Sequence, residues 1–504
     1  MKTLGLVGRE HEIDILNQLL NRKQSSFVII YGRRRVGKTT LIQRWSASTK
    51  LPTFYWESPR STADNVRSSL VREFGRWSTN LRGAIAPRYD DWLDVFRAMR
   101  QGIGDRQVIL IFDEFPWAVE ADPSLPSHLK TAWDQLFADS QAHLFITGSH
   151  ISAMEKLLDS DAPLFGRLTR KLHVRPLSYA QIKPFVARYD IEKRLAVYSI
   201  VGGIPDYLRN WDDRQDLLRN IEHIFVSDSS PYRTERQLLI SDVLRRSSPD
   251  YEAVLDAVGR GNHDADSIAT DAVVSSHRVS QVLSTLVEVR LINRRVRASV
   301  PIRQQGQARH GRYFLNDPFL QFYYRFIAPN RTLIAQGLLT ALEREFREQM
   351  RAFVGAAFEE LCRVWTLDQA QKERLPMIPE YIGSDWGPQH QADVVAVNWR
   401  SREVLIGEAK WTDHAINKGE WEEFRIRVEH VLTRLRAAET TASKKANTGG
   451  PDWKTHLYLF VRRGITAEAQ KASSVMNVKI IPFASMVRDL DQVSDNMDSA
   501  EPLI

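Results

Sequence analysis

The sequence of 504 residues contains a single cysteine, Cys362, and this shortage excludes two kinds of site. An internal disulfide needs two cysteines, and a zinc site built from cysteine thiolates needs more than one. The sequence also lacks an uninterrupted apolar run long enough to cross a bilayer. Its first residues, MKTLGLVGREHEIDIL, carry charges where a signal peptide has its apolar stretch. These absences predict a cytoplasmic protein that does not enter a membrane.

What the sequence does contain is the composition of an ordinary globular protein, with 43% hydrophobic and 26% charged residues. Its length predicts about three or four compact domains. The formal net charge of +7 and the isoelectric point near 9.3 favour polyanionic partners such as DNA. Because this charge is small for so long a chain, the positions of the arginines matter more than their number.

Residues 27–40, FVIIYGRRRVGKTT, combine an apolar run, a glycine-rich segment and the start of a helical pattern. This order is typical of a P-loop, in which backbone N–H groups and a helix N-terminus face the phosphates of a nucleotide. Lys38 would reach the outer phosphates, and the Thr39 hydroxyl would bind Mg²⁺. The predicted nucleotide-binding residues of this segment are Gly32, Arg33, Arg34, Arg35, Val36, Gly37, Lys38, Thr39 and Thr40.

A second apolar run, VILIFDEF at residues 108–115, predicts a central parallel strand that ends in two carboxylates. Asp113 would hold Mg²⁺, directly or through water, and Glu114 would polarise the attacking water. A third run, HLFITGS, ends in Thr147 and Ser149, which would sense the outer phosphate from the neighbouring strand. The first third of the sequence therefore predicts an enzyme that binds and hydrolyses ATP with Mg²⁺.

The motifs LVGRE, GRRRVGKT, FDEF, ITGS, PLFGR and VGGIPDYL occur in this order along the sequence. Together they resemble the archaeal-type ATPases of the STAND class, relatives of AAA+ and origin-recognition ATPases, over about the first 230 residues. The resemblance implies that Gly8 and Arg9 lie by the adenine. It also implies that a helical lid closes over the nucleotide through the turn from Gly203 to Pro205. Arg167 is a candidate sensor or arginine finger, and a structural salt bridge is its alternative role.

Residues 235–325 change to short helical patterns followed by strand patterns. The segment SSHRVSQVLSTLVEVRLI keeps its apolar residues on one helical face, which predicts the second helix of a helix-turn-helix. The outward face of that helix would present His277, Arg278 and Gln281, which are able to meet base edges or phosphates. The whole segment is therefore predicted to be a winged helix.

The predicted wing, residues 293–317, is a strand, a loop and a strand with many arginines. Such a cationic wing would contact the phosphate backbone or a narrow minor groove of DNA. Winged helices also serve as dimerisation or lid-coupling modules, so a structural role is the alternative. The arginines in this run are Arg294, Arg295, Arg297, Arg303, Arg309 and Arg312, of which Arg294, Arg295, Arg297 and Arg309 are the predicted DNA contacts.

Beyond residue 340, a helical stretch with FVGAAFEELCRVW precedes two β-rich runs that end in LIGEAKW. The β-rich runs predict a hairpin that turns near Arg400 and Ser401. Alternate side chains of a strand share a face, so Glu408 and Lys410 would lie together, and Asp393 and Glu359 would converge on them. Such carboxylates can hold Mg²⁺ for phosphodiester cleavage, while the lysine stabilises charge in the transition state.

This ordered set, a helical Glu followed by an Asp and then Glu-x-Lys, resembles the PD-(D/E)xK nuclease fold, whose multidomain forms also carry an ATPase and a winged helix. Ala392 stands where the motif has its proline. The resemblance implies that Asp393, Glu408 and Lys410 are catalytic and that Glu359, Asp393 and Glu408 are Mg²⁺ ligands. A relic of the fold that serves as a binding platform is the alternative.

The expected fold is a multidomain α/β protein. It comprises a P-loop NTPase core of AAA+ or STAND type at 1–175, a helical lid at 176–234, a winged helix at 235–330 and a restriction-endonuclease-like α/β domain at 335–504. The expected function is ATP-dependent DNA binding with a Mg²⁺-dependent DNA endonuclease controlled by nucleotide state. The alternative is a nucleotide-switch regulator with an inactive nuclease fold. ATP and Mg²⁺ are the expected cofactors, and the expected partners are DNA and, as a further option, a second copy of the chain in a homo-oligomer.

Overall fold

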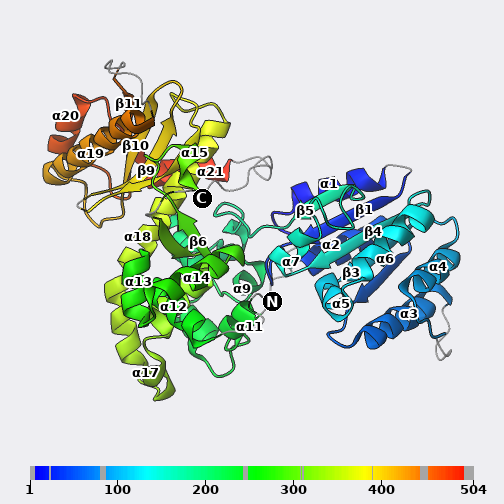
Figure 1. Ribbon diagram of the computed structural model, residues 1–504. Helices are drawn as coiled ribbons and strands as arrows, with labels where there is room; N and C mark the ends of the chain where they lie inside the picture. Colours follow the sequence, from blue (N-terminus) through cyan, green and yellow to red (C-terminus); the bar gives the residue numbers. More distant parts are fainter. Residues whose placement is uncertain are drawn as a thin grey trace. The chain divides into compact units, whose positions relative to one another are not determined.

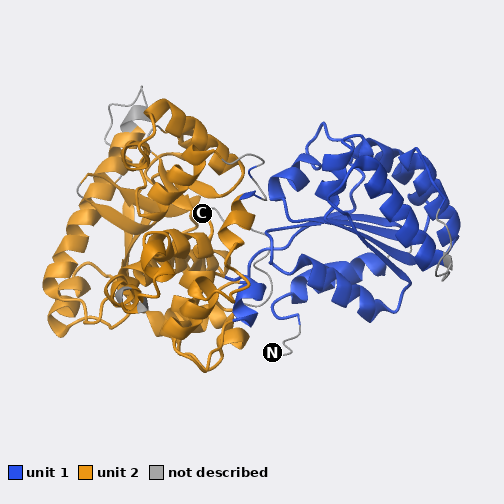
Figure 2. Ribbon diagram, turned by 90° about the horizontal axis from the view of Figure 1, so that it is seen from below, with its two compact units in different colours: residues 1–177, 203–210, 241–245 blue, residues 178–202, 211–240, 246–504 orange. Residues whose placement is uncertain are grey.

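The computed structural model describes residues 6–21, 24–79, 87–241, 244, 248–306, 308, 311–388, 390–442 and 452–492. The chain separates into two compact units (Figure 2). Unit 1 comprises residues 1–177, 203–210 and 241–245, and unit 2 comprises residues 178–202, 211–240 and 246–504. Within the described ranges, no helix has both the length and the apolar composition needed to cross a bilayer.

Unit 1 is built on a parallel sheet with the strand order β2-β3-β4-β1-β5. Residues in β1, β3 and β4 are almost all buried, as expected for strands that helices cover on both faces (Figure 2). The predicted central position of residues 108–113 is therefore confirmed. The strands are β1 (Ser26–Tyr31), β2 (Thr53–Glu57), β3 (Val108–Asp113), β4 (Ala142–Gly148) and β5 (Arg170–His173).

The helices of unit 1 follow from apolar residues at helical spacing. In α4, Trp92, Val95, Phe96 and Met99 lie on one buried face, and the Asp91 side chain caps the N-terminus by accepting from the Leu93 N–H. The helices are α1 (Glu10–Leu20), α2 (Lys38–Thr49), α3 (Ala63–Thr79), α4 (Trp92–Ile103), α5 (Phe115–Ala121), α6 (Leu125–Ala132), α7 (Ile151–Lys156) and α9 (Pro205–Arg209), with one π-helical turn, η1 (Trp133–Phe137).

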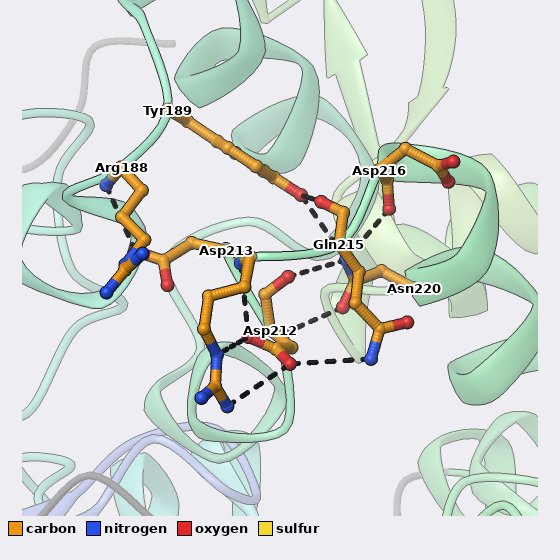
Figure 3. Close-up of polar contacts among 8 residues, drawn as sticks. Arg188, Tyr189, Asp212, Asp213, Gln215, Asp216 and Asn220 are labelled. Carbon is orange, nitrogen blue, oxygen red and sulfur yellow. Dashed lines mark hydrogen bonds and ion pairs between the residues drawn. The ribbon is translucent and has the colours of Figure 1, made fainter.

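The N-terminal part of unit 2 is helical and held by polar contacts around residues 188–220 (Figure 3). The buried Asn220 side chain donates to the Asp212 and Asp216 carbonyls at 2.9 Å, and its Oδ1 accepts from the Asp212 N–H at 2.7 Å. The Arg188 N–H donates to the buried Asp213 carboxylate at 3.0 Å. The elements are η2 (Lys183–Val186), α8 (Ile191–Val201), α10 (Leu217–Ile221), η3 (Glu222–Val226) and α11 (Glu235–Ser241).

Three helices and a two-stranded antiparallel sheet follow within residues 249–315 (Figure 1). Their order is the one predicted for residues 235–325, and the assignment as a winged helix stays a prediction. The apolar face of α14 is buried through Val279, Val282, Leu283 and Leu286. The elements are α12 (Pro249–Gly259), α13 (Ala265–Ala272), α14 (Ser276–Glu288), β6 (Ile292–Arg295), α15 (Ile302–Gln305) and β7 (Arg312–Leu315). After them come α16 (Pro318–Phe322), η4 (Tyr323–Ile327) and α17 (Arg331–Ala335).

The C-terminal part of unit 2 contains a mixed sheet with the strand order β12-β11-β10-β9-β8. β9 and β10 form the predicted hairpin, with Asn398 opposite Glu403 across the turn, and β10 runs parallel to β11. The strands are β8 (Tyr381–Trp386), β9 (Gln391–Asn398), β10 (Glu403–Lys410), β11 (Lys454–Val461) and β12 (Lys479–Pro482). The helices are α18 (Leu339–Gln371), α19 (Lys418–Ala442), α20 (Ala467–Ser474) and α21 (Phe483–Asp491).

The two faces of this sheet are covered by different helices because its strands alternate. Val394 and Leu405 pack with the apolar residues of α18 and α21. Val395 and Val404 pack instead with the apolar residues of α19. The predicted lid, residues 176–234, is divided between the two units, because residues 203–210 group with unit 1 and the flanking segments with unit 2.

Candidate functional site

The glycine-rich loop lies between β1 and α2, at the carboxyl edge of the parallel sheet in unit 1. A Cβ on Gly32 would stand 2.2 Å from the Val174 carbonyl oxygen, so only glycine fits there. Gly37, with φ at 97°, is the N-cap of α2. The Lys38 Nζ donates to the Gly32 carbonyl at 2.9 Å, the Arg33 carbonyl at 3.1 Å and the Ser149 Oγ at 3.0 Å. A glycine-rich loop at the start of α2 with a buried ammonium group fits the phosphates of a nucleotide.

Asp113, at the end of β3, is a buried carboxylate that gathers donors from three neighbouring elements. It accepts from the Thr39 hydroxyl at 2.8 Å and the Tyr55 hydroxyl at 2.7 Å, and also from the Thr147 hydroxyl. Burial and the charge of Asp113 raise the pKa of Tyr55 well above its usual range, so Tyr55 stays a donor. The Thr39 hydroxyl and the Asp113 carboxylate are thus adjacent oxygen ligands that fit the Mg²⁺ accompanying a nucleotide.

Glu114 follows directly and lies in the left-handed region, with φ at 49°. Its carboxylate accepts from the Ser149 hydroxyl at 2.6 Å, and the same Ser149 oxygen accepts from Lys38. Thr147 and Ser149, at the end of β4, therefore lie beside the acids at the end of β3 and beside the P-loop lysine. Thr147 contacts Asp113, and Ser149 is hydrogen-bonded to both Lys38 and Glu114. The carboxylate of Glu114 lies one hydrogen-bonded side chain away from the P-loop lysine.

Several arginines of unit 1 are held by defined contacts. Arg9 is buried and donates to the Val36 and Arg175 carbonyls at 3.0 and 2.8 Å, as well as to Glu12. Arg35 pairs with Asp206 at 2.7 Å, directly after the predicted Pro205 turn at the start of α9. Arg167 pairs with Asp134 at 3.2 Å, which agrees with its alternative role as a structural salt bridge.

The glycine-rich loop also contacts the segment around α9. Arg33 donates to the Tyr207 hydroxyl at 3.3 Å, so the loop contacts α9 through two arginines. Gly203 approaches Leu177 so closely that a Cβ would stand 1.7 Å from the Leu177 carbonyl oxygen. The Leu177 N–H donates to the Gly203 carbonyl at 2.7 Å. Gly8, Arg34 and Thr40 lie in the described chain, and their predicted contact with nucleotide stays a prediction.

The C-terminal sheet brings together the four residues predicted for a second site. Asp393, from β9, accepts at its Oδ2 from the Ala409 N–H of β10 at 3.0 Å. Glu408 and Lys410 share a face of β10, with the Lys410 Nζ 3.0 Å from Glu408 Oε1. Glu359 comes from α18. Its carboxyl group interacts electrostatically with those of Asp393 and Glu408, so all three acids lie close together.

Mutual repulsion and burial disturb the protonation of these acids. Burial and the neighbouring Asp393 raise the pKa of Glu408 to about 7, although Lys410 and Arg427 oppose the shift. Burial and Asp393 also raise the pKa of Glu359, and burial raises that of Asp393. Three carboxylates that resist ionisation together are typical of a site that receives a cation or shares a proton.

Two cations already approach Glu408. Besides Lys410, Arg427 of α19 forms an ion pair with the same Oε1 atom, and Glu408 Oε2 is buried without a hydrogen-bond partner. In the described ranges, no three His, Cys, Asp or Glu side chains are arranged so that they could hold one metal ion. The carboxylate types and the orphaned oxygen fit Mg²⁺, and closer approach of the acids would be needed to complete its coordination.

The comparisons with known proteins address the first site. Residues 6–211 match the family described as an ATPase domain predominantly from Archaea. Residues 6–211 form an archaeal-type P-loop ATPase domain. Residues 323–424, which include Glu359, Asp393 and Glu408, match a family of archaeal and bacterial proteins of unknown function.

Individual relatives of the ATPase are archaeal. The chain is 27% identical over 413 residues to an uncharacterized protein of Methanocaldococcus jannaschii, covering 81% of this chain and 88% of the relative. It is 40% identical over 45 residues to an uncharacterized ATP-binding protein of the same organism, covering 9% of this chain and 76% of the relative. Among solved structures, a Walker-type ATPase of Pyrococcus abyssi matches at 19% identity and a TM-score of 0.46, covering 63% of this chain and 95% of that one. The ORC2 protein of Aeropyrum pernix matches at 14% identity and a TM-score of 0.41, covering 67% and 97%.

The residues predicted to contact DNA fall into two groups outside the ATPase domain. On α14, His277 and Gln281 are exposed, and Arg278 pairs with Asp250 at 2.7 Å. On the hairpin, Arg295 pairs instead with Glu360 of α18 at 2.9 Å, and Arg294 donates to the Ala308 carbonyl. The ion pair of Arg295 with Glu360 agrees with the alternative, structural role of the wing, and the predicted contact of Arg295 with DNA stays a prediction. Arg297 is half-buried, and Arg309 lies outside the described residues.

Sequence reasoning missed several residues of both sites. Tyr55, Arg427 and Arg363 each contact a predicted site residue or its backbone from a distant segment. Only the contact between Glu360 and Arg363 could have been predicted locally, because their i, i+3 spacing on a helix allows the observed ion pair at 2.6 Å. Nothing in the sequence near Tyr55 or Arg427 indicates the partners that they meet after folding.

Proposed function

We propose that this ATPase couples its nucleotide state to DNA binding and to Mg²⁺-dependent DNA cleavage by its C-terminal part. One observation carries the nuclease proposal: α18, β9 and β10 bring Glu359, Asp393, Glu408 and Lys410 together at one end of the sheet. The chain order of these residues and of their elements supports the resemblance to the PD-(D/E)xK fold. Assignment of the ATPase to the STAND class stays a prediction.

In the ATPase part, each residue has a role that its contacts support. Lys38 would bind the outer phosphates, and Thr39 and Asp113 would hold Mg²⁺. Glu114, held by Ser149, would orient and polarise the attacking water. The Arg35 and Asp206 pair connects the loop to α9, the segment proposed to close over the nucleotide.

In the proposed nuclease, Asp393, Glu408 and Glu359 would hold Mg²⁺. The ion would supply an activated water and offset charge on the leaving oxygen. Lys410 would leave its partner Glu408 and stabilise the negative charge that develops on the phosphate. Arg427 would contact the adjacent phosphate for the same electrostatic reason. DNA would meet the exposed side chains of α14, His277 and Gln281, together with Arg278.

A second function is a nucleotide-dependent regulator that binds DNA or a protein through a silent nuclease fold. The observation that favours it is the double pairing of Glu408 Oε1 with Lys410 and Arg427, which balances the charge of the acid without a metal. Both functions share the ATPase, so ATP hydrolysis does not distinguish them.

DNA cleavage distinguishes them. The purified chain is incubated with linear, nicked, single-stranded and supercoiled DNA, with Mg²⁺ or Mn²⁺, and with and without ATP. We expect cleavage that Asp393→Ala and Glu408→Ala abolish and Lys410→Ala slows, with ATP binding retained in all three. Glu420→Gln, on the same domain but in an ordinary helix-start position, is the matched control and should cut like the parent. Absence of cleavage by the parent, or cleavage unaffected by these changes, leaves the regulator as the function.

A further inference from the structure

The hairpin of β6 and β7, residues 292–315, is docked on the C-terminal sheet; we call it the wing hairpin. The Ala298 N–H donates to the Ser384 carbonyl at 2.9 Å, and the Ser299 N–H donates to the Asp385 carboxylate at 3.0 Å. Ala298 is fully buried in the same apolar core as Val395 and Val404. The wing hairpin therefore contributes to the core that supports the acid cluster.

One set of contacts runs from the wing hairpin to the backbone of Asp393. Arg295 pairs with Glu360 at 2.9 Å, and Glu360 pairs with Arg363 at 2.6 Å. The Arg363 Nη1 then donates to the Asp393 carbonyl at 2.6 Å. The Arg363 side chain is almost completely buried, so its position depends on these two acceptors. Displacing Arg295 would release Glu360 and thereby Arg363.

A second set reaches the side chain of the same aspartate. Arg312 is the cross-strand partner of Arg295, and its Nη1 donates to the Gln391 Oε1 at 3.1 Å. The Gln391 Nε2 donates to the Asp393 Oδ1 at 3.4 Å, and the Arg312 guanidinium stacks on the Trp386 ring at 4.9 Å. The two arginines of one cross-strand pair are thus linked to the backbone and to the side chain of one carboxyl residue.

The joint between the wing hairpin and the sheet contains a cavity of about 100 Å³. It is lined by Asn293, Arg294 and Arg295 from the wing hairpin and by Arg363, Tyr381 and Gly383 from the C-terminal part. A void of this size holds a few waters, whereas a filled core resists displacement. The Arg295 and Arg363 side chains therefore line space that the apolar core does not fill, whereas Ala298 is held within that core.

We infer that the wing hairpin is a positioning element for the acid cluster, in which Arg295 and Arg312 set the orientation of Asp393 and thereby metal affinity and cleavage. The inference rests on the proposed nuclease function and adds its regulation. Neither arginine touches the reacting atoms, because Arg295 acts through Glu360 and Arg363, and Arg312 acts through Gln391. Whatever moves the wing hairpin, such as DNA bound at the adjoining α14, would be transmitted to the site.

The test compares Arg295→Ala, Arg312→Ala and Arg295→Lys in the full chain. Arg303→Ala is the matched control, because Arg303 is an exposed arginine of the same hairpin. Mn²⁺ affinity is measured by calorimetry, and hydrogen exchange is followed at the Ala409 amide, which donates to Asp393 Oδ2. The values of kcat and KM for DNA cleavage provide a third measurement.

We expect both alanine variants to weaken Mn²⁺ binding and lower kcat by about 10- to 100-fold, with KM for DNA little changed. Exchange at Ala409 should rise, exchange in the core of α19 should stay at the parent value, and Arg295→Lys should recover part of the loss. Parent-like exchange and Mn²⁺ affinity in both variants would overturn the inference. So would a uniform rise in exchange across the whole sheet, because that indicates unfolding. If the parent neither binds Mn²⁺ nor cuts DNA, the nuclease proposal fails, and exchange at Ala409 alone decides whether the hairpin positions Asp393.

Discussion

At the scale of single residues, the proposed roles in the ATPase site separate a group that binds phosphate from a group that acts on water. Lys38 is a buried cation held by two backbone carbonyls and Ser149, whereas Glu114 is an acid held by Ser149 alone among the contacts above. Ser149 therefore lies between the group proposed to neutralise phosphate, Lys38, and the group proposed to polarise water, Glu114. Substitutions at the two ends should have different kinetic effects.

Lys38→Ala should weaken ATP binding, because a charge-assisted hydrogen bond to phosphate contributes about 1.5 to 3 kcal/mol, roughly 10- to 100-fold in Kd. Glu114→Gln should bind ATP normally and hydrolyse it about a hundredfold more slowly, the usual size of a general-base contribution. Glu120→Gln, an exposed acid on α5, is the control. Nucleotide titration and phosphate release measure the two effects. Parent-like turnover by Glu114→Gln would remove Glu114 from catalysis.

His143 predicts a pH dependence of the stability of unit 1. Burial lowers the pKa of His143 to about 4 from an ordinary 6.5, and its Nδ1 lies 2.7 Å from the Ser26 hydroxyl between β4 and β1. Because the pKa of His143 is lower in the folded state, the unfolded chain binds a proton below about pH 6.5 and the folded chain does not. The free energy of unfolding therefore decreases as the pH is lowered. The loss from pH 7 to pH 5 should be about 2 kcal/mol.

The measurement is hydrogen exchange of peptides from β1 and β4 at both pH values, corrected for intrinsic exchange. His143→Gln keeps a polar side chain at the position but does not titrate, so its pH dependence should be smaller than that of the parent. His128→Gln, at a partly exposed position on α6, is the control and should retain the full dependence. Equal slopes in the parent and His143→Gln would contradict this account.

At the scale of elements, α14 and the wing hairpin have different electrostatic environments. Arg278 of α14 is about two-fifths exposed and pairs with Asp250, whereas Arg295 of β6 pairs with Glu360 inside the joint with the C-terminal sheet. DNA phosphates could replace Asp250 as the partner of Arg278 without dismantling a core. For Arg295, the same exchange would break the contacts that lead to Asp393.

Arg278→Ala should therefore weaken binding to all duplexes and reduce the salt dependence of log K by about 0.9, the value for one phosphate contact. Arg295→Ala should leave that salt slope unchanged. Ser280→Ala, an exposed residue of the same helix, is the control. Fluorescence anisotropy across a range of salt concentrations measures all four proteins. If Arg295→Ala lowers the salt dependence of log K and Arg278→Ala does not, the wing hairpin and not α14 contacts the DNA phosphates.

At the scale of the whole molecule, one short segment belongs to a different unit from the chain on either side of it. Residues 203–210, which include α9, belong to unit 1, and the chain on either side of them belongs to unit 2. The loop arginines hold this segment, Arg35 through Asp206 and Arg33 through the Tyr207 hydroxyl. A change in the loop on nucleotide binding therefore acts on a segment whose two ends continue into unit 2.

We expect ATP to raise DNA cleavage at least about fivefold in the parent, the lower end of typical coupling between sites. Asp206→Asn should abolish most of this response while ATP turnover stays near the parent value, because the substitution removes the charge that holds Arg35. Asp212→Asn, a neighbouring acid paired with Arg214, is the control. ATP-dependent DNA affinity is measured in parallel, so the coupling is tested even if the chain does not cut. A parent-like response of Asp206→Asn to ATP would exclude coupling through the Arg35 and Asp206 ion pair.

The ATP site was largely predictable from the sequence because its chemistry is local. Gly32, Gly37, Lys38 and Thr39 are fixed by the spacing of a strand, a loop and a helix, and period-two alternation is enough to place Glu408 beside Lys410. The parallel apolar runs likewise indicate that the ends of β3 and β4 meet at one edge.

Tertiary structure alone decided which charges meet across the molecule. The sequence places Arg295 in a cationic run, and folding brings it to Glu360 on a helix far along the chain; Arg427 reaches Glu408 in the same way. Such pairs depend on how helices and sheets pack, and the energy of a charge depends on burial and on its neighbours in space. The local spacing of residues contains no information on packing or on burial. For this reason the sequence determined the nucleotide loop and the acids on the strands, whereas packing determined which cations pair with those acids.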